Sequence, residues 1–335
     1  MTVTALTLTS HLSSVLPQPG RSALRESVIP SLLKAISAIA TALSEAQHVS
    51  LSGTANSFGD DQLNVDVIAE DLIRAALEHC PSVKTASSEE DPVEKPVKHS
   101  QPSDTQEQYT VAFDPLDGSS IIAPNWTVGT IIGIWDNGAS ALSLSPSQKQ
   151  IAAILGVFGP RTTAVVALRV PGSEAICFEV GLGTAATGGH EYYSEVIRPR
   201  ILFSSDPNPK TRYFAPANLR AAAEDERYMA LVSKYISEKY TLRYSGGLVP
   251  DVVHALVKGH GVYLSPVTGQ SKAKLRRLYE LCPLALVVEC AGGRAIDPAT
   301  GRDVLETEVR NCDERGGLIC GTKEEVEIAR GVLTG

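Results

Sequence analysis

One segment constrains this chain more than any other: the octet Phe-Asp-Pro-Leu-Asp-Gly-Ser-Ser at residues 113–120. The residues that lead into it, 109–113, are mainly apolar, aromatic or β-branched and predict a strand. Asp114 and Asp117 then lie at or just beyond the carboxyl end of that strand, where open α/β sheets bind ligands. The octet therefore favours an α/β fold with a ligand site at one edge of a sheet.

The octet also indicates a particular chemistry. Mg²⁺ requires oxygen ligands, so Asp114 and Asp117 are suited to hold it together with a substrate phosphate. Gly118, Ser119 and Ser120 add backbone N–H groups and two hydroxyls, which can cradle a phosphate if a helix or nest begins there. The alternative is an ordinary surface turn, because Asp-Pro and Asp-Gly are both turn-forming pairs.

Composition limits the partners of such a site. A chain of 335 residues can bury a large core and form two subdomains. Its net charge of −8 leaves no general basic surface for nucleic acid or an anionic membrane. A bound phosphate must therefore be met by local cations or a metal. Six cysteines without a Cys-x-x-Cys motif indicate reduced thiols. The apolar stretches at 151–158 and 163–170 are too short to span a membrane.

The order of the predicted elements indicates two domains. Helical spacing of apolar residues predicts an amphipathic helix over 27–46, and a loop over 50–66 leads into a second helix over 67–78. Val- and Ile-rich segments over 151–180 predict a mixed or antiparallel sheet. Strands and helices alternate from residue 198 onward. We therefore place an N-terminal, metal-binding domain at 1–197 and a C-terminal, sugar-phosphate-binding domain at 198–335.

Four acids upstream of the octet are candidates for the same site, although each has an ordinary alternative. Asp60 and Asp66 follow a Gly- and Ser-rich stretch and could be loop or N-cap residues. Glu89 and Glu90 are adjacent, and adjacent acids are usually only solvated. If these four acids surround a metal, some of them can be ionised ligands, while another can be a proton acceptor with a pKa nearer neutrality.

Two downstream segments carry cations. Arg276 and Glu280 are four positions apart, which on a helix predicts a routine surface ion pair. With Lys274 nearby, the same segment instead offers phosphate-binding cations and one more carboxylate. Arg243 and Tyr244 are neighbours on a predicted strand and would point to opposite faces, so one could serve this site and the other a neighbouring subunit.

The octet resembles the signature of the metal-dependent sugar bisphosphatases, the family that contains fructose-1,6-bisphosphatase and sedoheptulose-1,7-bisphosphatase. The resemblance includes Ser-Glu-Glu-Asp at 88–91 and the segment 272–280, and it spans roughly residues 50–321. It implies that family's layered α-β-α-β-α fold, with a sheet in each of two subdomains. Asn-Trp-Thr-Val-Gly-Thr at 125–130 is more similar to the sedoheptulose enzymes than to the fructose enzymes.

The resemblance also implies roles for individual residues. Roughly two or three Mg²⁺ ions, with Mn²⁺ as the alternative, would bind per site. Their ligands would be Glu89, Asp114, Asp117, Glu280 and the carbonyl of Leu116. The catalytic residues would be Asp60, Asp66, Glu90 and Arg276. Substrate contacts would come from Gly118, Ser119, Ser120, Asn218, Arg220, Tyr244 and Lys274, and from Arg243 across the interface of a homodimer or homotetramer.

The implied reaction is hydrolysis of the 1-phosphate of a ketose bisphosphate. Asp66 and Glu90 would take a proton from the attacking water, and Arg276 would orient Asp60. Sedoheptulose 1,7-bisphosphate is the first expectation and fructose 1,6-bisphosphate the alternative; a catalytically silent sugar-phosphate sensor is a remote third. We expect a cytoplasmic protein with a soluble N-terminal arm, or a plastid protein if a targeting segment has been removed.

Overall fold

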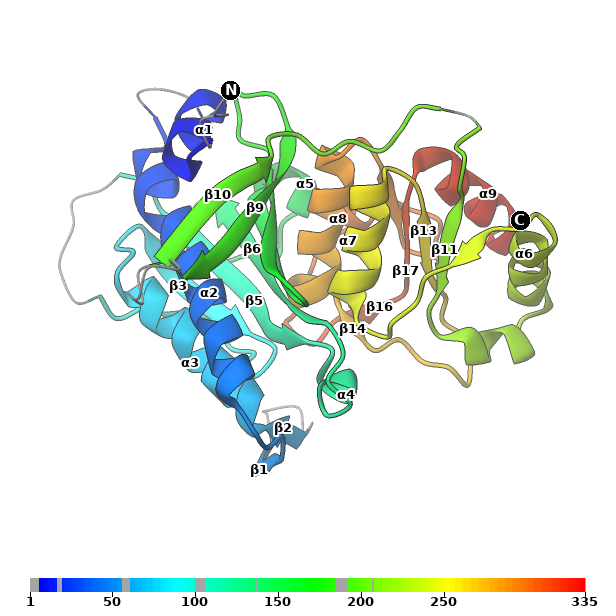
Figure 1. Ribbon diagram of the computed structural model, residues 1–335, viewed down its shortest axis with the longest axis horizontal. Helices are drawn as coiled ribbons and strands as arrows, with labels where there is room; N and C mark the ends of the chain where they lie inside the picture. The colour runs from blue at the N-terminus through cyan, green and yellow to red at the C-terminus, as the bar shows by residue number, and fades with distance from the viewer. Residues whose placement is uncertain are drawn as a thin grey trace.

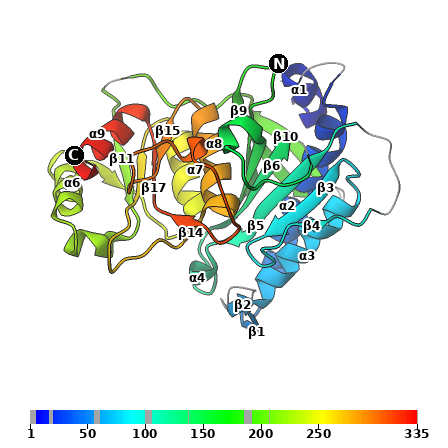
Figure 2. The same cartoon turned by 180° about the vertical axis from the view of Figure 1, so that it is seen from behind.

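The computed structural model describes residues 6–16, 20–55, 61–99, 106–136, 138–184, 192–206 and 208–334. They form five layers, alternating helices and sheets (Figure 1). Six helices make the three helical layers: α2 (Ile29–Glu45) with α3 (Asn64–Glu78), α7 (Leu248–Lys258) with α8 (Cys282–Cys290), and α6 (Glu226–Ser237) with α9 (Lys323–Leu333). The second pair lies between the two sheets in both views (Figures 1 and 2). The layered α/β fold predicted from the sequence is confirmed.

The larger sheet has eight strands in the order β10-β9-β8-β7-β6-β5-β3-β4. Their bounds are β3 (Val83–Ser88), β4 (Lys95–Pro96), β5 (Tyr109–Asp117), β6 (Val128–Asp136), β7 (Gln150–Phe158), β8 (Thr162–Leu168), β9 (Ile176–Thr184) and β10 (Tyr192–Arg198). Strands β3 and β5 are parallel, and the other neighbouring pairs in this sheet are antiparallel. The prediction of a mixed or antiparallel sheet over 151–180 is therefore correct.

The N-terminal helices pack their apolar faces on this sheet. Helix α1 (Leu8–Val15) lies against β10, and a short π-helical turn, η1 (Leu24–Val28), continues directly into α2. The stretch Leu24–Glu45 has the length and hydropathy of a membrane span. However, Leu32, Leu33 and Ile36 are fully buried, and α2 packs on α3 and on strands β7 to β9. These contacts are those of a core helix.

The smaller sheet has five strands in the order β12-β11-β13-β17-β15. Their bounds are β11 (Tyr213–Pro216), β12 (Thr241–Leu242), β13 (Val262–Ser265), β15 (Arg294–Ile296) and β17 (Leu318–Gly321). Strand β11 is parallel to both of its neighbours, and the remaining pairs are antiparallel. The chain thus forms two domains, each with a mixed sheet, while the exact boundary after residue 197 stays a prediction.

Helix α8 shows why the two domains pack closely. It contacts β6, β7 and β8 on one side and β15 and β17 on the other. A helix covered on both sides needs apolar residues all round rather than along one stripe. Leu284, Leu286 and Val288 are accordingly all fully buried.

The predicted loop over 50–66 contains two short strands and the start of a helix. Strands β1 (Leu51–Ala55) and β2 (Asp61–Leu63) form a hairpin, and α3 begins at Asn64, three residues earlier than predicted. The Asn64 side chain explains this start. Its Oδ1 accepts from the backbone N of Ser50 at 3.0 Å and its Nδ2 donates to the His48 carbonyl at 3.1 Å, so it ties both ends of the hairpin together.

The central octet differs from the prediction in one respect: β5 does not stop at residue 113. It continues through both aspartates, with Asp114 opposite Ile131 and Asp117 opposite Gly129. A register shift between these pairs accommodates one extra residue of the Asp-Pro-Leu-Asp run. The hydroxyl of Thr130 donates to the Pro115 carbonyl at 2.8 Å and stabilises this bulge.

Two predictions about the C-terminal domain are wrong in detail. Arg276 is not on a helix: β14 (Leu275–Arg276) pairs with β16 (Arg315–Gly316), and a π-helical turn, η3 (Arg277–Leu281), follows. Strand pairing therefore overrides the helical spacing, and Arg276 and Glu280 are buried rather than a surface pair. Similarly, β12 ends at Leu242, so Arg243 and Tyr244 lie just beyond a strand.

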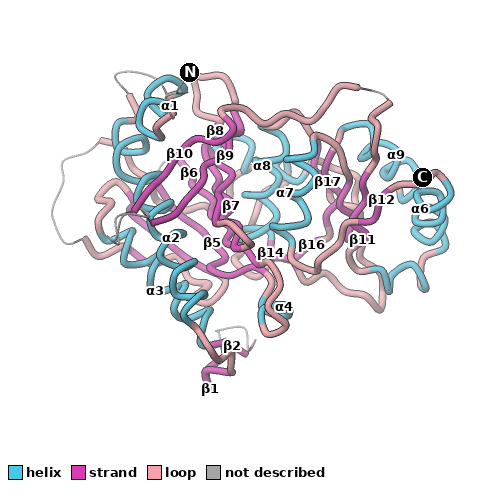
Figure 3. Tube along the Cα trace, viewed as in Figure 1, coloured by secondary structure: helices cyan, strands magenta, loops and turns pink. Residues whose placement is uncertain are grey.

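Four short elements complete the described fold: α4 (Ser119–Ile122), α5 (Pro146–Lys149), η2 (Leu219–Ala223) and η4 (Val304–Glu306). The carboxyl end of β5, α4 and β14 lie along one edge of the molecule (Figures 1 and 3). Segments from both domains therefore meet where the octet ends.

Candidate active site

Three carboxylates from distant parts of the chain meet at this edge. Glu89, Asp114 and Glu280 each place one carboxylate oxygen within 4.8 Å of the other two. Strand pairing brings the first two together, because Ser88 is opposite Phe113 in the parallel β3–β5 ladder and the Glu89 N–H donates to the Phe113 carbonyl at 3.0 Å. Glu280 arrives from η3, which packs against β5.

Burial and mutual repulsion make this carboxylate cluster costly in its charged form. The pKa of Asp114 is well above its usual range because the side chain is buried, and the charges of Glu89 and Glu280 raise it further. The pKa of Glu280 is raised well above its usual range by burial and then by Glu89. A bound cation would relieve both effects. The donor set is entirely carboxylate oxygen, which fits a hard ion such as Mg²⁺.

Arg276 is the cation that the fold places beside the cluster. Its side chain is buried and its Nη1 donates to Glu89 Oε1, while its backbone N donates to Glu280 Oε2 at 2.5 Å. Its Nε also lies 3.5 Å from Asp313. The predicted partner, Asp60, lies outside the described residues. Arg276 thus orients two carboxylates of the cluster.

Asp117 has a second task in the fold. Its two carboxylate oxygens accept the backbone N–H groups of Leu248 at 3.2 Å and Val249 at 2.7 Å, the first two residues of α7. Burial raises the pKa of Asp117 to about 6, although these two hydrogen bonds oppose the shift. Asp117 therefore links β5 to the start of a helix in the other domain. Its role as a metal ligand stays a prediction.

The turn after Asp117 depends on glycine. Gly118 has φ +99°, a left-handed conformation, and an added Cβ would lie 3.2 Å from Val128 Cγ1. The Ile121 N–H donates to the Gly118 carbonyl at 2.9 Å, which closes the turn into α4. Just upstream, the Leu116 N–H donates to Asp114 Oδ1 at 3.0 Å. The Leu116 carbonyl accepts from the Ser119 hydroxyl at 3.4 Å.

A second acidic group lies where α3 meets the octet. Asp66, in the first turn of α3, accepts the Leu63 N–H at 2.9 Å. The pKa of Asp66 is raised to about 7, mainly by burial and in part by the charge of Glu90. Backbone and Ser119 hydrogen bonds oppose this shift. A carboxylate with a pKa near 7 can accept a proton at neutral pH.

Glu90 is oriented by a residue that sequence reasoning missed. The side-chain Nε2 of Gln62 donates to Glu90 Oε2 at 2.5 Å. Gln62 follows a run of acids in a loop-like stretch, and nothing in that local pattern indicates a partner 28 positions later. Contacts of this kind become visible only when the hairpin is placed beside the end of β3.

The predicted distal contacts lie in the C-terminal domain. Asn218 has φ +50° and its Nδ2 donates to the Pro266 carbonyl at 2.7 Å, so its amide already holds a loop. Arg220 is exposed on η2. Burial raises the pKa of Tyr244, and the charge of Arg220 opposes part of this shift. Arg243 lies over the Tyr213 ring at 5.8 Å. Lys274 lies in the loop before β14.

The loop that carries Arg243 and Tyr244 is anchored by Asp251, to which the sequence patterns assigned no role. Asp251, in the first turn of α7, accepts the N–H groups of Ser245 at 2.7 Å and Gly246 at 3.3 Å. Its side chain is buried, and burial raises the pKa of Asp251 to about 6. An acid just after a Ser-Gly-Gly turn at a helix start is the signal that could have identified it.

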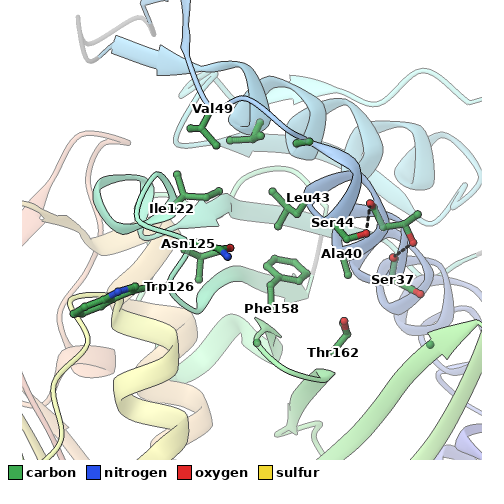
Figure 4. A pocket seen from close by; sticks show the side chains of 16 residues that line it. Ser37, Ala40, Leu43, Ser44, Val49, Ile122, Asn125, Trp126, Phe158 and Thr162 are labelled. Atoms are coloured by element: carbon green, nitrogen blue, oxygen red, sulfur yellow. Dashed lines mark hydrogen bonds between the residues drawn. The ribbon is translucent and has the colours of Figure 1, made fainter.

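A cavity of about 430 Å³ lies beside the octet (Figure 4). One wall comes from α2, through Leu43 and Ser44, and the opposite wall from Ile122 and Asn125. Phe158 also lines this cavity. The described carboxylates of the cluster do not line this cavity, so it is separate from the acidic site.

Two sequence profiles of one protein family match most of the chain. The sequence profile described as Fructose-1-6-bisphosphatase, N-terminal domain, matches residues 7–187, and the profile for the C-terminal domain matches residues 208–334. The chloroplastic sedoheptulose-1,7-bisphosphatase of Spinacia oleracea is 38% identical over 274 residues, which is 81% of this chain and 64% of that protein. The chain thus spans slightly less than two thirds of this relative.

Bacterial and structural relatives agree with this placement. The class 1 fructose-1,6-bisphosphatase of Geobacter sulfurreducens is 32% identical over 291 residues, covering 85% of this chain and 83% of that protein. A crystal structure from Toxoplasma gondii, provisionally named sedoheptulose-1,7 bisphosphatase, superposes with a TM-score of 0.81 at 32% identity, covering 98% of each chain. Leishmania major fructose-1,6-bisphosphatase shares the fold, with a TM-score of 0.82 at 24% identity.

Proposed function

Because this chain belongs to the fructose-1,6-bisphosphatase family, we propose that it is a sugar bisphosphatase that hydrolyses the 1-phosphate of sedoheptulose 1,7-bisphosphate. The convergence of Glu89, Asp114 and Glu280 within 4.8 Å is the observation that carries the phosphatase part. The choice of sugar is supported by the higher identity to sedoheptulose enzymes, 38%, than to the fructose enzymes, 32–33%. The products would be sedoheptulose 7-phosphate and inorganic phosphate.

The metal site of this proposal uses the carboxylate cluster. Glu89, Asp114 and Glu280 would hold Mg²⁺, with Asp117 and the Leu116 carbonyl as further oxygen ligands. When bound, Mg²⁺ would neutralise phosphate charge and lower the pKa of a water molecule. The protein's own contribution is to hold the carboxylates close together, through the Glu89–Phe113 backbone bond and the two bonds from Arg276.

Asp66 and Glu90 would remove the proton from the attacking water. Asp66 has the appropriate proton affinity, since burial raises its pKa to about 7. The Gln62 side chain donates to one oxygen of Glu90 and so orients this carboxylate. Ser119 hydrogen-bonds to Asp66 and connects this pair to the octet.

The far phosphate would bind in the C-terminal domain. Asn218, Arg220, Tyr244 and Lys274 supply the polar and cationic groups on this subunit. Arg243 of a second subunit would complete the clamp in a homodimer or homotetramer. Binding energy from the distal phosphate would position the reacting end without touching it.

Phosphate release from the two bisphosphates, measured side by side with and without Mg²⁺, tests the proposal. We expect Mg²⁺-dependent turnover with kcat/KM higher for the sedoheptulose substrate. A higher kcat/KM for fructose 1,6-bisphosphate would favour the second candidate, which the 32–33% identity to bacterial fructose enzymes supports. Absence of turnover on both substrates would refute the enzymatic proposal.

The proposed compartment is the cytoplasm. The net charge of −8 and the burial of the apolar face of α2 favour a protein that works in solution. Several of the matched relatives are named as chloroplastic, so a plastid location is the alternative.

A further inference from the structure

A partly buried ionic network of Glu70, Arg74 and Asp91 adjoins the Glu89–Glu90 pair. Glu70, one turn after Asp66 on α3, accepts the Ser88 hydroxyl at 2.9 Å and the Arg74 Nε at 2.5 Å on the same oxygen, Oε1. Arg74 also reaches Asp91, with its Nη2 3.5 Å from Oδ2. Helix α3 is thereby joined to the end of β3 by side chains alone.

The network includes the residues on both sides of Glu89 and Glu90 in the chain. Ser88 precedes Glu89 in the chain and Asp91 follows Glu90. The Asp91 N–H donates to the Ser88 hydroxyl at 2.9 Å, and the Ser88 N–H donates to the Asp91 carbonyl at 3.1 Å. The turn 88–91 therefore has fixed ends, and the two glutamates project from it.

This arrangement is costly for folding, which suggests another purpose. The Glu70 residue is 8% exposed and Ser88 is fully buried. Burial raises the pKa of Glu70, although Arg74 and Ser88 oppose the shift. The second oxygen of Glu70, Oε2, has no hydrogen-bond partner among the described residues. A well-packed apolar residue at this position of α3 would often be at least as stabilising.

We propose that Glu70 is a positioning residue for the predicted metal ligand Glu89 and its neighbour Glu90, acting through Ser88 and Arg74. Glu70 itself lies behind the turn and is outside the Glu89–Asp114–Glu280 cluster. Its removal should loosen the turn, weaken binding of Mg²⁺ and slow turnover, while leaving distal-phosphate contacts in the other domain intact. The inference rests on the proposed phosphatase function for its kinetic readout only.

Three variants distinguish the loss of the Glu70 hydrogen bonds from the loss of one negative charge. Glu70→Leu removes the acceptor, Glu70→Gln keeps an oxygen for Ser88 and Arg74, and Asp71→Asn makes the same charge change at an exposed neighbouring acid. The melting temperature of each variant is recorded without substrate at increasing concentrations of MgCl₂. The Mg²⁺ midpoint is the concentration that gives half of the full shift in melting temperature. We expect Glu70→Leu to raise the Mg²⁺ midpoint at least about fivefold and to lower kcat at least about tenfold, with KM within about twofold. Glu70→Gln should stay within about threefold of wild type, and Asp71→Asn should match wild type.

A Glu70→Leu protein whose Mg²⁺ midpoint equals that of Asp71→Asn would overturn the proposal. If Glu70→Leu does not fold, Ser88→Ala removes one hydroxyl from the same network. Its Mg²⁺ midpoint must then rise, and a wild-type midpoint would equally refute the positioning role. The melting measurement needs no substrate, so it decides the matter even if the wild-type protein hydrolyses neither bisphosphate.

Discussion

At the scale of single residues, sequence motifs predict some residues of this site but not others. Glu89, Asp114 and Glu280 were identified through their motifs, and the fold brings them together. Gln62, Glu70 and Asp251 were not identified. Their tasks depend on hydrogen bonds to segments that sequence patterns do not place beside them. Local sequence can nominate an acid, but it cannot show which acid is oriented by which neighbour.

Asp66 provides a pH-dependent prediction for stability. Its folded pKa of about 7 exceeds its ordinary value of 3.8, so the folded chain binds the proton more tightly than the unfolded chain. Protonation of Asp66 therefore stabilises the folded state. This stabilisation is fully present below about pH 4 and is lost as the pH rises through about 7; it amounts to at most about 4 kcal/mol. Urea unfolding of wild type and Asp66→Asn at pH 4.5 and 7.5, without Mg²⁺, measures it. Wild type should lose more stability than Asp66→Asn over this interval, and equal losses would contradict the assignment.

At the scale of elements, strand and helix types were more predictable than their ends. The helix over 27–46 and the sheet over 151–180 have strong periodicity and were predicted correctly. The end of β5 was misplaced because a register shift lets the strand pass through Pro115. The helix expected at Arg276 was wrong because a two-residue strand pairs with Arg315–Gly316. Tertiary pairing decided both cases.

The turn at Gly118 offers a test at this scale. A side chain there meets both a left-handed backbone, φ +99°, and Val128 Cγ1 at 3.2 Å. Gly118→Ala should therefore lower the free energy of unfolding by about 1–2 kcal/mol. Gly269→Ala is the control, because that glycine is exposed and nothing lies within 4 Å of its added Cβ. The two values are measured by urea unfolding; an unchanged stability for Gly118→Ala would show that the turn is less constrained than described.

At the scale of the whole molecule, hydrogen bonds join the candidate site across both domains. Asp117 on β5 accepts the first N–H groups of α7, and Arg276 from the C-terminal domain holds Glu89 from the N-terminal one. The layered fold followed from the family resemblance. The hydrogen bonds between the domains could not be predicted, because no sequence pattern in one domain specifies which residue of the other domain it will contact.

The predicted distal clamp can be tested at this scale through Arg243. Its guanidinium lies over the Tyr213 ring at 5.8 Å, and in the proposal it would bind the far phosphate of a substrate held by a second subunit. Arg243→Ala should raise KM for the bisphosphate about tenfold or more, since a charged hydrogen bond contributes roughly 1.5–3 kcal/mol, with kcat changed less. Steady-state kinetics supply the measurement. A large fall in kcat at constant KM would remove Arg243 from the clamp.

The central claim is that Glu89, Asp114 and Glu280 bind a divalent metal at the end of β5. The most direct test is anomalous diffraction from a crystal soaked in Mn²⁺ with inorganic phosphate, using Asp114→Asn as the matched control. Wild-type crystals should show an anomalous peak between these three carboxylates, and the peak should be weakened or absent in Asp114→Asn. A wild-type crystal in which that position is empty while Mn²⁺ binds elsewhere would contradict it.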